Sequence, residues 1–169
     1  GAKKVLQIGS VIEREFSYKL IKQVVDFPEH VLMANLTALE NLELLYERGV
    51  HPESTYSFKH ALTREVVYDS ILTKRRNQIH ENIATAIEDV CQNNIENHYG
   101  ALINHFLQNA NARKVATYSK LAFQKAQDDM LLHDATEYAK KWIAALESLP
   151  LSKQPKVEII EARSALGFV

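Results

Sequence analysis

Apolar residues recur at helical spacing through most of this chain, and one short region breaks the pattern. Residues 3–12 carry an apolar face that predicts a first helix, and Ser17 can cap a second that runs to about Val25. Pro28 stands where helices commonly begin, and a third helix is expected after it. The inward faces of these helices are expected to comprise Val5, Leu6, Ile8, Val11, Ile12, Leu20, Ile21, Val24, Val25, Val31, Leu32, Leu36, Leu39 and Leu42.

The break lies at residues 44–59. Residues 44–48 have extended character, and GVHPES at 49–54 is rich in turn-forming residues. Residues 55–59 then alternate as a second strand, with Tyr56 and Phe58 on one face. Three helices followed by a β-hairpin is the order of a winged helix-turn-helix domain, so the sequence predicts one over residues 1–72.

Helical spacing returns at Lys59-His60, first in a short helix over residues 61–72 with Leu62, Val66, Ile71 and Leu72 as its apolar positions. In the next helix Ile79, Ile83 and Ile87 repeat every four residues, a narrow stripe suited to packing on one neighbour. Three more amphipathic helices are expected over 95–107, 113–128 and 134–149, with separators at 109–111 and 150–155. Short links between similar helices imply antiparallel neighbours, so residues 73–169 are predicted to begin an α-solenoid of tetratricopeptide-like helical hairpins.

The last two of these helices fit the tetratricopeptide pattern in part. With Pro150 as the closing proline, Trp142 and Ala145 occupy the aromatic and small positions of the second helix. Tyr138 stands where a small residue is expected, and Asp129 replaces an aromatic residue. The repeat is therefore degenerate. Residues 56–88 join the two predicted architectures and become the expected hinge of the chain.

Composition narrows the functional classes. The chain has 169 residues with a net charge of −1, so no global field draws it to nucleic acid or membrane. The single cysteine, Cys91, excludes an internal disulfide and fits a reducing cytoplasm. No apolar run reaches membrane-spanning length, and no signal peptide precedes the first helix. Both ends lie at or within helices, which suggests a fragment of a longer cytoplasmic protein.

Two longer motifs carry a family resemblance. LQIGSVIEREFS at residues 6–17 resembles the opening of the winged-helix region of bacterial STAND-type signalling ATPases, with Glu13 where relatives usually have glycine. FKHAL at 58–62, EVVY at 65–68, Arg75-Arg76 and His80 match the second signature of that family in order and spacing. Such regions follow a nucleotide-binding domain and precede tetratricopeptide-like helices. They are found in class III adenylate cyclases, hybrid kinases and LuxR-type regulators.

The resemblance implies an ADP/ATP-controlled switch in the full-length protein. In related proteins a histidine at the end of the wing reaches the nucleotide phosphates in the resting state, and the matching residue here is His60. An imidazole at the head of a helix, beside backbone N–H donors and the positive dipole end, is suited to an anionic phosphate. The alternative is that His60 caps the helix or packs under the wing.

The other motif residues are expected to form an interdomain joint comprising Phe58, Tyr68, Arg75, Arg76 and His80. Arg75-Arg76 opens a helix, where positive charge is unfavourable against the helix dipole, so a carboxylate partner such as Asp69 or Glu65 is expected. Tyr68 and His80 are expected to fix the short helix on the long one. Lys59 alternates away from Phe58 and is expected in solvent.

Three other functional classes compete with this interpretation. Direct DNA binding is disfavoured because residues 28–47 hold Glu29, Glu40, Glu43 and Glu47 and no Lys or Arg. An enzymatic fragment is disfavoured because there is no G-x-x-x-x-G-K-[ST] loop, and the histidines have no spacing that predicts a metal site. A plain interaction scaffold without nucleotide coupling stays open, because stacked helix pairs build partner-binding surfaces. The expected partners are an upstream ATPase domain of the same chain and an effector on the helices.

Overall fold

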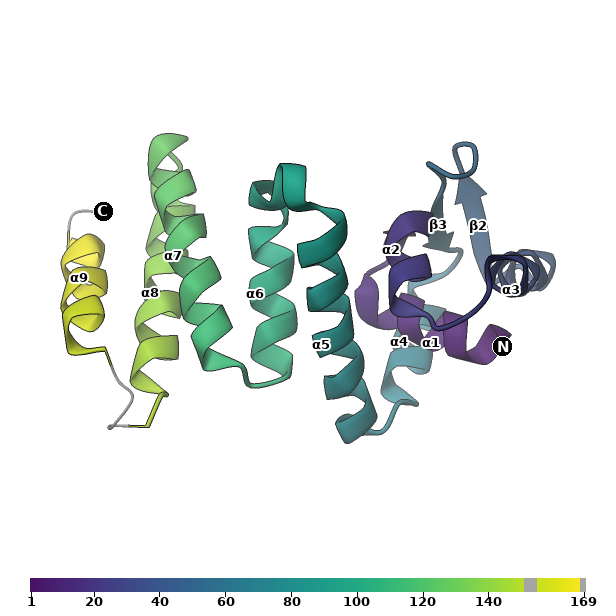
Figure 1. Cartoon of the computed structure of the whole chain (residues 1–169), viewed down its shortest axis with the longest axis horizontal. Helices are drawn as coiled ribbons and strands as arrows, with labels where there is room; N and C mark the ends of the chain where they lie inside the picture. Colours follow the sequence, from purple (N-terminus) through teal and green to yellow (C-terminus); the bar gives the residue numbers. More distant parts are fainter. Residues whose placement is uncertain (151–154, 168–169) are drawn as a thin grey trace. The chain divides into compact units, whose positions relative to one another are not determined.

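The computed structural model describes residues 1–150 and 155–167. It is mainly helical with one small antiparallel sheet, and it divides into two compact units, Gly1–Val90 and Cys91–Val169 (Figure 1). The sequence placed the domain boundary between residues 72 and 73. In the structure the helix after that point packs on the first unit, so the first compact unit extends to Val90.

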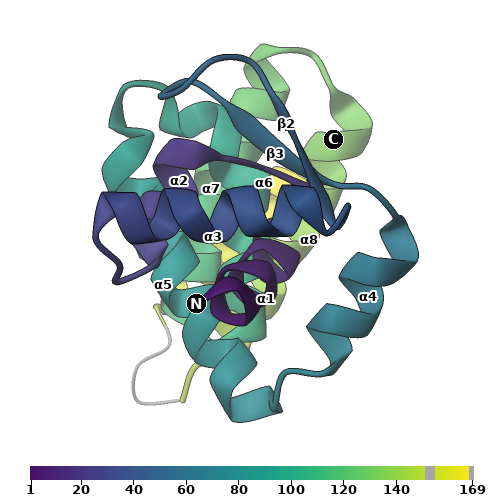
Figure 2. The same cartoon turned by 90° about the vertical axis from the view of Figure 1, so that its right-hand side faces the viewer.

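The first unit contains the expected order of three helices and a hairpin. Its elements are α1 (Ala2–Ile12), β1 (Glu15–Ser17), α2 (Tyr18–Val24), α3 (Glu29–Asn41), β2 (Leu45–Arg48), β3 (Thr55–Phe58), α4 (Ala61–Asp69) and α5 (Thr73–Val90). Helix α1 is central, because α2, α3, α4 and α5 all contact it (Figure 2).

The sheet has a strand that the sequence did not predict. Its order is β1-β3-β2, and both pairings are antiparallel. In the added pairing, Phe16 of β1 lies opposite Tyr56 of β3, with ring centroids 6.1 Å apart. Phe16 also meets Phe58 edge-on at 6.4 Å, and all three rings are buried. The strand therefore anchors the hairpin to the aromatic core of this unit.

Local sequence signals account for the helices of the first unit. The Ser17 side chain accepts a hydrogen bond from the backbone N–H of Leu20 at 3.2 Å, the expected N-cap of α2. The expected inward face of α1 is buried, and so are Ile79, Ile83 and Ile87 on α5. Leu42 differs from the prediction, because α3 ends at Asn41 and the Leu42 side chain is 66% exposed.

Helix α4 is shorter and less buried than its apolar positions suggest. It ends at Asp69 rather than Leu72, and none of its residues is fully buried. Leu62 and Val66 face solvent, whereas Ile71, just after the helix, is buried. The position of α4 against the rest of the first unit therefore depends on polar contacts.

The second unit is a row of helices. They are a short 3-10 helix η1 (Gln92–His98), α6 (Tyr99–Gln108), α7 (Ala112–Asp128), α8 (Leu132–Glu147) and α9 (Lys156–Gly167). Each α-helix packs on the next along the chain (Figure 1). The expected helix over 95–107 is divided, because residues 95–98 belong to the 3-10 helix η1 and the α-helix begins only at Tyr99, after the N-cap residue His98. Of the predicted separator at 150–155, residues 151–154 lie outside the described residues.

Small and aromatic residues form the core of the second unit. Trp142 of α8 is 1% exposed and lies 6.2 Å from the ring of Phe123 on α7. Ala145, which the sequence placed at a small position of the repeat, is also buried. Phe106 of α6 stacks on Tyr118 of α7 at 5.8 Å. These contacts hold α6, α7 and α8 together as neighbours.

Candidate functional site

His60 lies at the junction between β3 and α4. Its backbone is extended (φ −129°, ψ 129°), and its carbonyl oxygen accepts the N–H groups of Thr63 and Arg64, so His60 is the N-cap residue of α4. Its side chain makes no capping hydrogen bond and is exposed. Neither part of the alternative interpretation therefore holds, since the imidazole neither caps the helix nor packs beneath the hairpin.

An ion pair stands beside His60. The ammonium of Lys59 lies 3.0 Å from a carboxylate oxygen of Glu43, and the backbone N–H of Lys59 donates to the Leu44 carbonyl oxygen at 3.1 Å. The hydrogen bond from Lys59 lowers the pKa of Glu43, its charge adds to this, and His60 contributes less. As expected, Lys59 is exposed. The junction therefore presents an imidazole next to a carboxylate that Lys59 already neutralises.

A second cluster joins α4 to α5. The Tyr68 hydroxyl lies 3.3 Å from Nε2 of His80, and the two ring centroids are 6.2 Å apart. The guanidinium of Arg76 lies 4.5 Å from the centroid of the Tyr68 ring. Arg76 is also 3.8 Å from the carboxylate of Asp69, one of the two partners expected for the arginine pair. The short helix is thus held on the long one through Tyr68. The predicted joint was interdomain, but all of its residues lie within the first unit, because α5 packs there.

The environment of His80 favours its neutral form. Its side chain is 6% exposed. Desolvation by burial, and secondarily the charge of Arg76, lower the pKa of His80 from 6.5 to about 4. A neutral ring with its proton on Nδ1 accepts a hydrogen bond from the Tyr68 hydroxyl at Nε2, and a ring with its proton on Nε2 donates one to the hydroxyl oxygen. In either tautomer His80 is neutral at neutral pH and is joined to Tyr68.

The six predicted site residues do not form one site. Tyr68, Arg76 and His80 meet at the α4–α5 joint, whereas His60 lies at the opposite end of α4. Phe58 is fully buried in the aromatic core, and Arg75 is exposed. The joint and the histidine are connected through α4 itself, a helix of 9 residues.

Sequence reasoning missed the part played by Arg64. Its Nε donates to the carbonyl oxygen of Ser10 in the last turn of α1 at 3.0 Å. Carbonyls of a last helical turn have no partner within their own helix, and positive charge is favourable there. Arg64 precedes Tyr68 by one helical turn, and that spacing is a signal that both residues share the inward face of α4.

The surface expected to face DNA in a winged helix is not basic. Helix α3 carries Glu29 and Glu40, and it has no Lys or Arg. Desolvation and the charge of Glu47 raise the pKa of Glu40. Within residues 1–150 and 155–167, no group of three or more His, Cys, Asp or Glu side chains is arranged to hold a metal ion. No helix in the described part of the chain is long and apolar enough to cross a membrane.

Comparison of this chain with protein-family models, with curated proteins and with solved structures found no match.

Proposed function

We propose that this chain is a non-catalytic regulatory part of a STAND-type signalling ATPase. In this proposal the first unit is a winged helix that closes on an upstream nucleotide-binding domain of the same protein. The helices of the second unit are tetratricopeptide-like and receive a partner. ATP and ADP are the ligands of the parent protein, and His60 contacts the phosphates in the ADP-bound state.

One observation carries the proposal. The exposed side chain of His60, the residue that matches the family histidine in the sequence resemblance, stands at the head of α4 without capping that helix. A histidine kept at a helix start for structural reasons would normally cap the helix or be buried. An exposed imidazole beside the first N–H groups of a helix is instead suited to an external anion.

The joint supplies a route between the two ends of α4. Tyr68 and Arg76 hold the last turn of α4 against α5 while His60 occupies its first turn. A shift of α5 relative to α1 would therefore move the head of α4. Such a shift is the step by which a partner on the helices would loosen the phosphate contact in our proposal.

The test uses the parent protein, with its nucleotide-binding domain, and measures ADP that copurifies. We expect the wild-type protein to retain ADP and the His60→Ala variant to lose most of it. His30→Ala is the matched control, because His30 is an exposed histidine of α3 in the same unit. Equal ADP retention in all three proteins would exclude the phosphate role of His60.

A second candidate is a partner-binding scaffold without nucleotide coupling. It is favoured by an apolar pocket on the helical unit. If the parent protein had no nucleotide-binding domain, the nucleotide switch would be excluded and the scaffold function would remain. A DNA-binding regulator is the weaker alternative, given the acidic residues of α3.

A further inference from the structure

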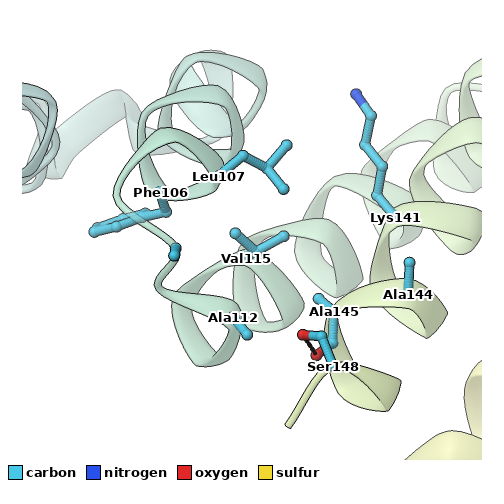
Figure 3. A pocket seen from close by; sticks show the side chains of 9 residues that line it. Phe106, Leu107, Ala112, Val115, Lys141, Ala144, Ala145 and Ser148 are labelled. Atoms are coloured by element: carbon cyan, nitrogen blue, oxygen red, sulfur yellow. Dashed lines mark hydrogen bonds between the residues drawn. The ribbon is translucent and has the colours of Figure 1, made fainter. Parts of the chain in front are cut away.

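An open pocket of about 280 Å³ lies among α6, α7 and α8 (Figure 3). Its wall is apolar and includes Phe106, Leu107, Ala112, Val115, Ala144 and Ala145. The floor belongs to the core, because Phe106, Val115 and Ala145 are buried. The rim is accessible, since Leu107 is 48% exposed and Ala144 is exposed as well. An apolar surface of this kind is left open to solvent in the described structure.

Two polar side chains border this apolar surface. The Ser148 hydroxyl already donates to the Ala145 carbonyl oxygen at 2.8 Å. The side chain of Lys141 extends from α8 along the mouth of the pocket, opposite Leu107 of α6 (Figure 3). The ligand chemistry is therefore set by a hydrophobic floor and one ammonium group.

Among the described residues no carboxylate lies within ion-pair distance of Lys141. Glu137, one turn earlier on the same helix, pairs with Lys140 at 2.8 Å. The hydrogen bond and the charge of Lys140 lower the pKa of Glu137, and the charge of Lys141 contributes less. On the neighbouring helix α7, Arg113 pairs with Glu158 and Lys120 with Glu161. Lys141 contacts the Tyr138 ring, with Nζ 5.7 Å from its centroid. Its ammonium is thus available to an external carboxylate at the pocket mouth.

The exposed apolar rim of the pocket favours a side chain of a partner over a whole small molecule. The volume of about 280 Å³ lies at the lower edge of the range of small-molecule sites, roughly 300–1,000 Å³. A small molecule would leave the exposed rim uncovered, whereas a partner backbone would cover it. Protein interfaces commonly concentrate their affinity in one large apolar anchor that fills such a pocket, inside a rim of polar contacts.

We propose that this pocket binds an acidic peptide segment of a partner protein. One large apolar side chain of the peptide enters between Phe106, Val115 and Ala145, and a carboxylate next to it pairs with Lys141. The site needs no nucleotide, so it stands whether or not the first unit belongs to an ATPase.

The test uses this chain and a fluorescently labelled peptide of five residues, a phenylalanine with two glutamates on each side. Fluorescence polarisation gives the dissociation constant, and amide chemical shifts locate the contact. We expect submillimolar binding with shifts confined to α6, α7 and α8. Two altered peptides should bind at least about tenfold more weakly, one with alanine for phenylalanine and one with lysines for the glutamates.

Variants of the chain separate the two parts of the site. Lys141→Glu should weaken binding by about fivefold or more, because it replaces attraction by repulsion. Lys141→Met keeps the apolar stem of the side chain and should weaken peptide binding less than Lys141→Glu does. Ala144→Phe fills the mouth and should weaken binding by at least about tenfold. Lys74→Glu is the matched control, an equal charge reversal at an exposed lysine of α5 outside the pocket, and should change the affinity by less than about twofold.

Several results would overturn the proposal. No detectable peptide binding would do so, as would equal binding of the lysine-containing peptide. Shifts that map outside α6, α7 and α8 would place the contact elsewhere. If N-acetylphenylalanine bound as tightly as the peptide, the pocket would be a site for small apolar acids instead.

Discussion

The hydroxyl of Tyr68 lies 3.3 Å from Nε2 of His80 and links α4 to α5 at a point where few apolar contacts do so. No residue of α4 is fully buried, and Leu62 and Val66 are mostly exposed. The position of α4 therefore depends on this hydrogen bond, on the Arg76 contacts and on Arg64. Because His60 begins the same helix, these polar contacts also set the position of the candidate phosphate ligand.

Burial of neutral His80 makes the first unit sensitive to acid. The pKa of His80 is lowered from 6.5 to about 4, so its contribution to stability is present above pH 6.5 and is lost as pH falls toward 4. We expect this single group to account for about 2 kcal/mol of the stability lost between pH 7 and pH 4.5. Urea unfolding of wild-type and His80→Gln proteins at both pH values measures the difference.

The glutamine variant keeps a polar partner for Tyr68 and removes the titration. Its stability should therefore fall less on acidification than that of the wild-type protein. His30→Gln removes an exposed histidine and should leave the pH dependence unchanged. If the unfolding free energy of the His80→Gln variant fell as much between pH 7 and pH 4.5 as that of the wild-type protein, protonation of this residue would not control acid stability.

Gly9 is required by close approach rather than by backbone conformation. A Cβ at this position would lie 2.6 Å from Cε1 of Phe16. That ring cannot withdraw, because Tyr56 and Phe58 enclose it. Overpacking costs about 1–3 kcal/mol, which exceeds the gain of up to about 1 kcal/mol from alanine in a helix. We expect Gly9→Ala to destabilise the chain by about 1–2 kcal/mol in chemical denaturation.

Gly100 supplies the matched control. It also lies in a helix, but a Cβ there would be 3.5 Å from the Tyr138 hydroxyl oxygen, an ordinary contact. Gly100→Ala should therefore be neutral or stabilising by up to about 1 kcal/mol. A Gly9→Ala protein as stable as Gly100→Ala would contradict the packing found between α1 and β1.

The hydrogen bond from Arg64 to the Ser10 carbonyl oxygen should determine how firmly α4 is held. Replacing Arg64 by methionine keeps much of the aliphatic stem and leaves that carbonyl without its donor. A lost hydrogen bond to a charged group costs about 1.5–3 kcal/mol. We expect faster hydrogen exchange at the amides of α4 and little change in α2 and α3.

Glu65→Gln changes an exposed neighbour of Arg64 and serves as the control for that exchange experiment. It should leave the α4 amides as protected as in the wild-type protein. If Arg64→Met behaved in the same way, the Arg64–Ser10 contact would have no role in seating α4.

The acidic character of α3 predicts no direct DNA binding by the first unit. Affinity for duplex DNA depends on neutralising phosphates, and α3 offers Glu29 and Glu40 instead of Lys or Arg. An electrophoretic shift assay at about 50 mM salt, where nonspecific binding is strongest, should show no complex. A shift that disappears when basic residues of this unit are replaced would reverse this assignment.

Local signals made much of the first unit predictable from sequence, and the missed features are long-range ones. The Ser17 cap and the isoleucine stripe of α5 depend on residues within a few positions. Strand β1 has only 3 residues, too few to show an alternating pattern. Its pairing of Phe16 with Tyr56 exists only in the folded chain. The same holds for the packing of α5 on α1 and α2, which extends the first unit to Val90.

The candidate site residues show the same difference between local features, which the sequence predicted, and long-range contacts, which it did not. The motif indicated that Tyr68 and His80 connect two helices, and the hydrogen bond between them agrees with this. It also suggested Asp69 as a partner of the arginine pair, which Arg76 contacts. The contact from Arg64 to α1 was missed because its acceptor is a backbone carbonyl, which has no sequence signature. Phe58 is a core residue. This agrees with the strand alternation, which places Phe58 and the exposed Lys59 on opposite faces.

In our proposal the chain is part of an ADP-binding parent protein, and the release rate of ADP from that protein tests this central claim most directly. Loss of one hydrogen bond to a charged phosphate costs about 1.5–3 kcal/mol, so His60→Ala should release a fluorescent ADP analogue roughly 10–100-fold faster than wild type. His30→Ala should release it at the wild-type rate. Equal release rates in the His60→Ala and wild-type proteins would contradict the account of His60 as the phosphate contact.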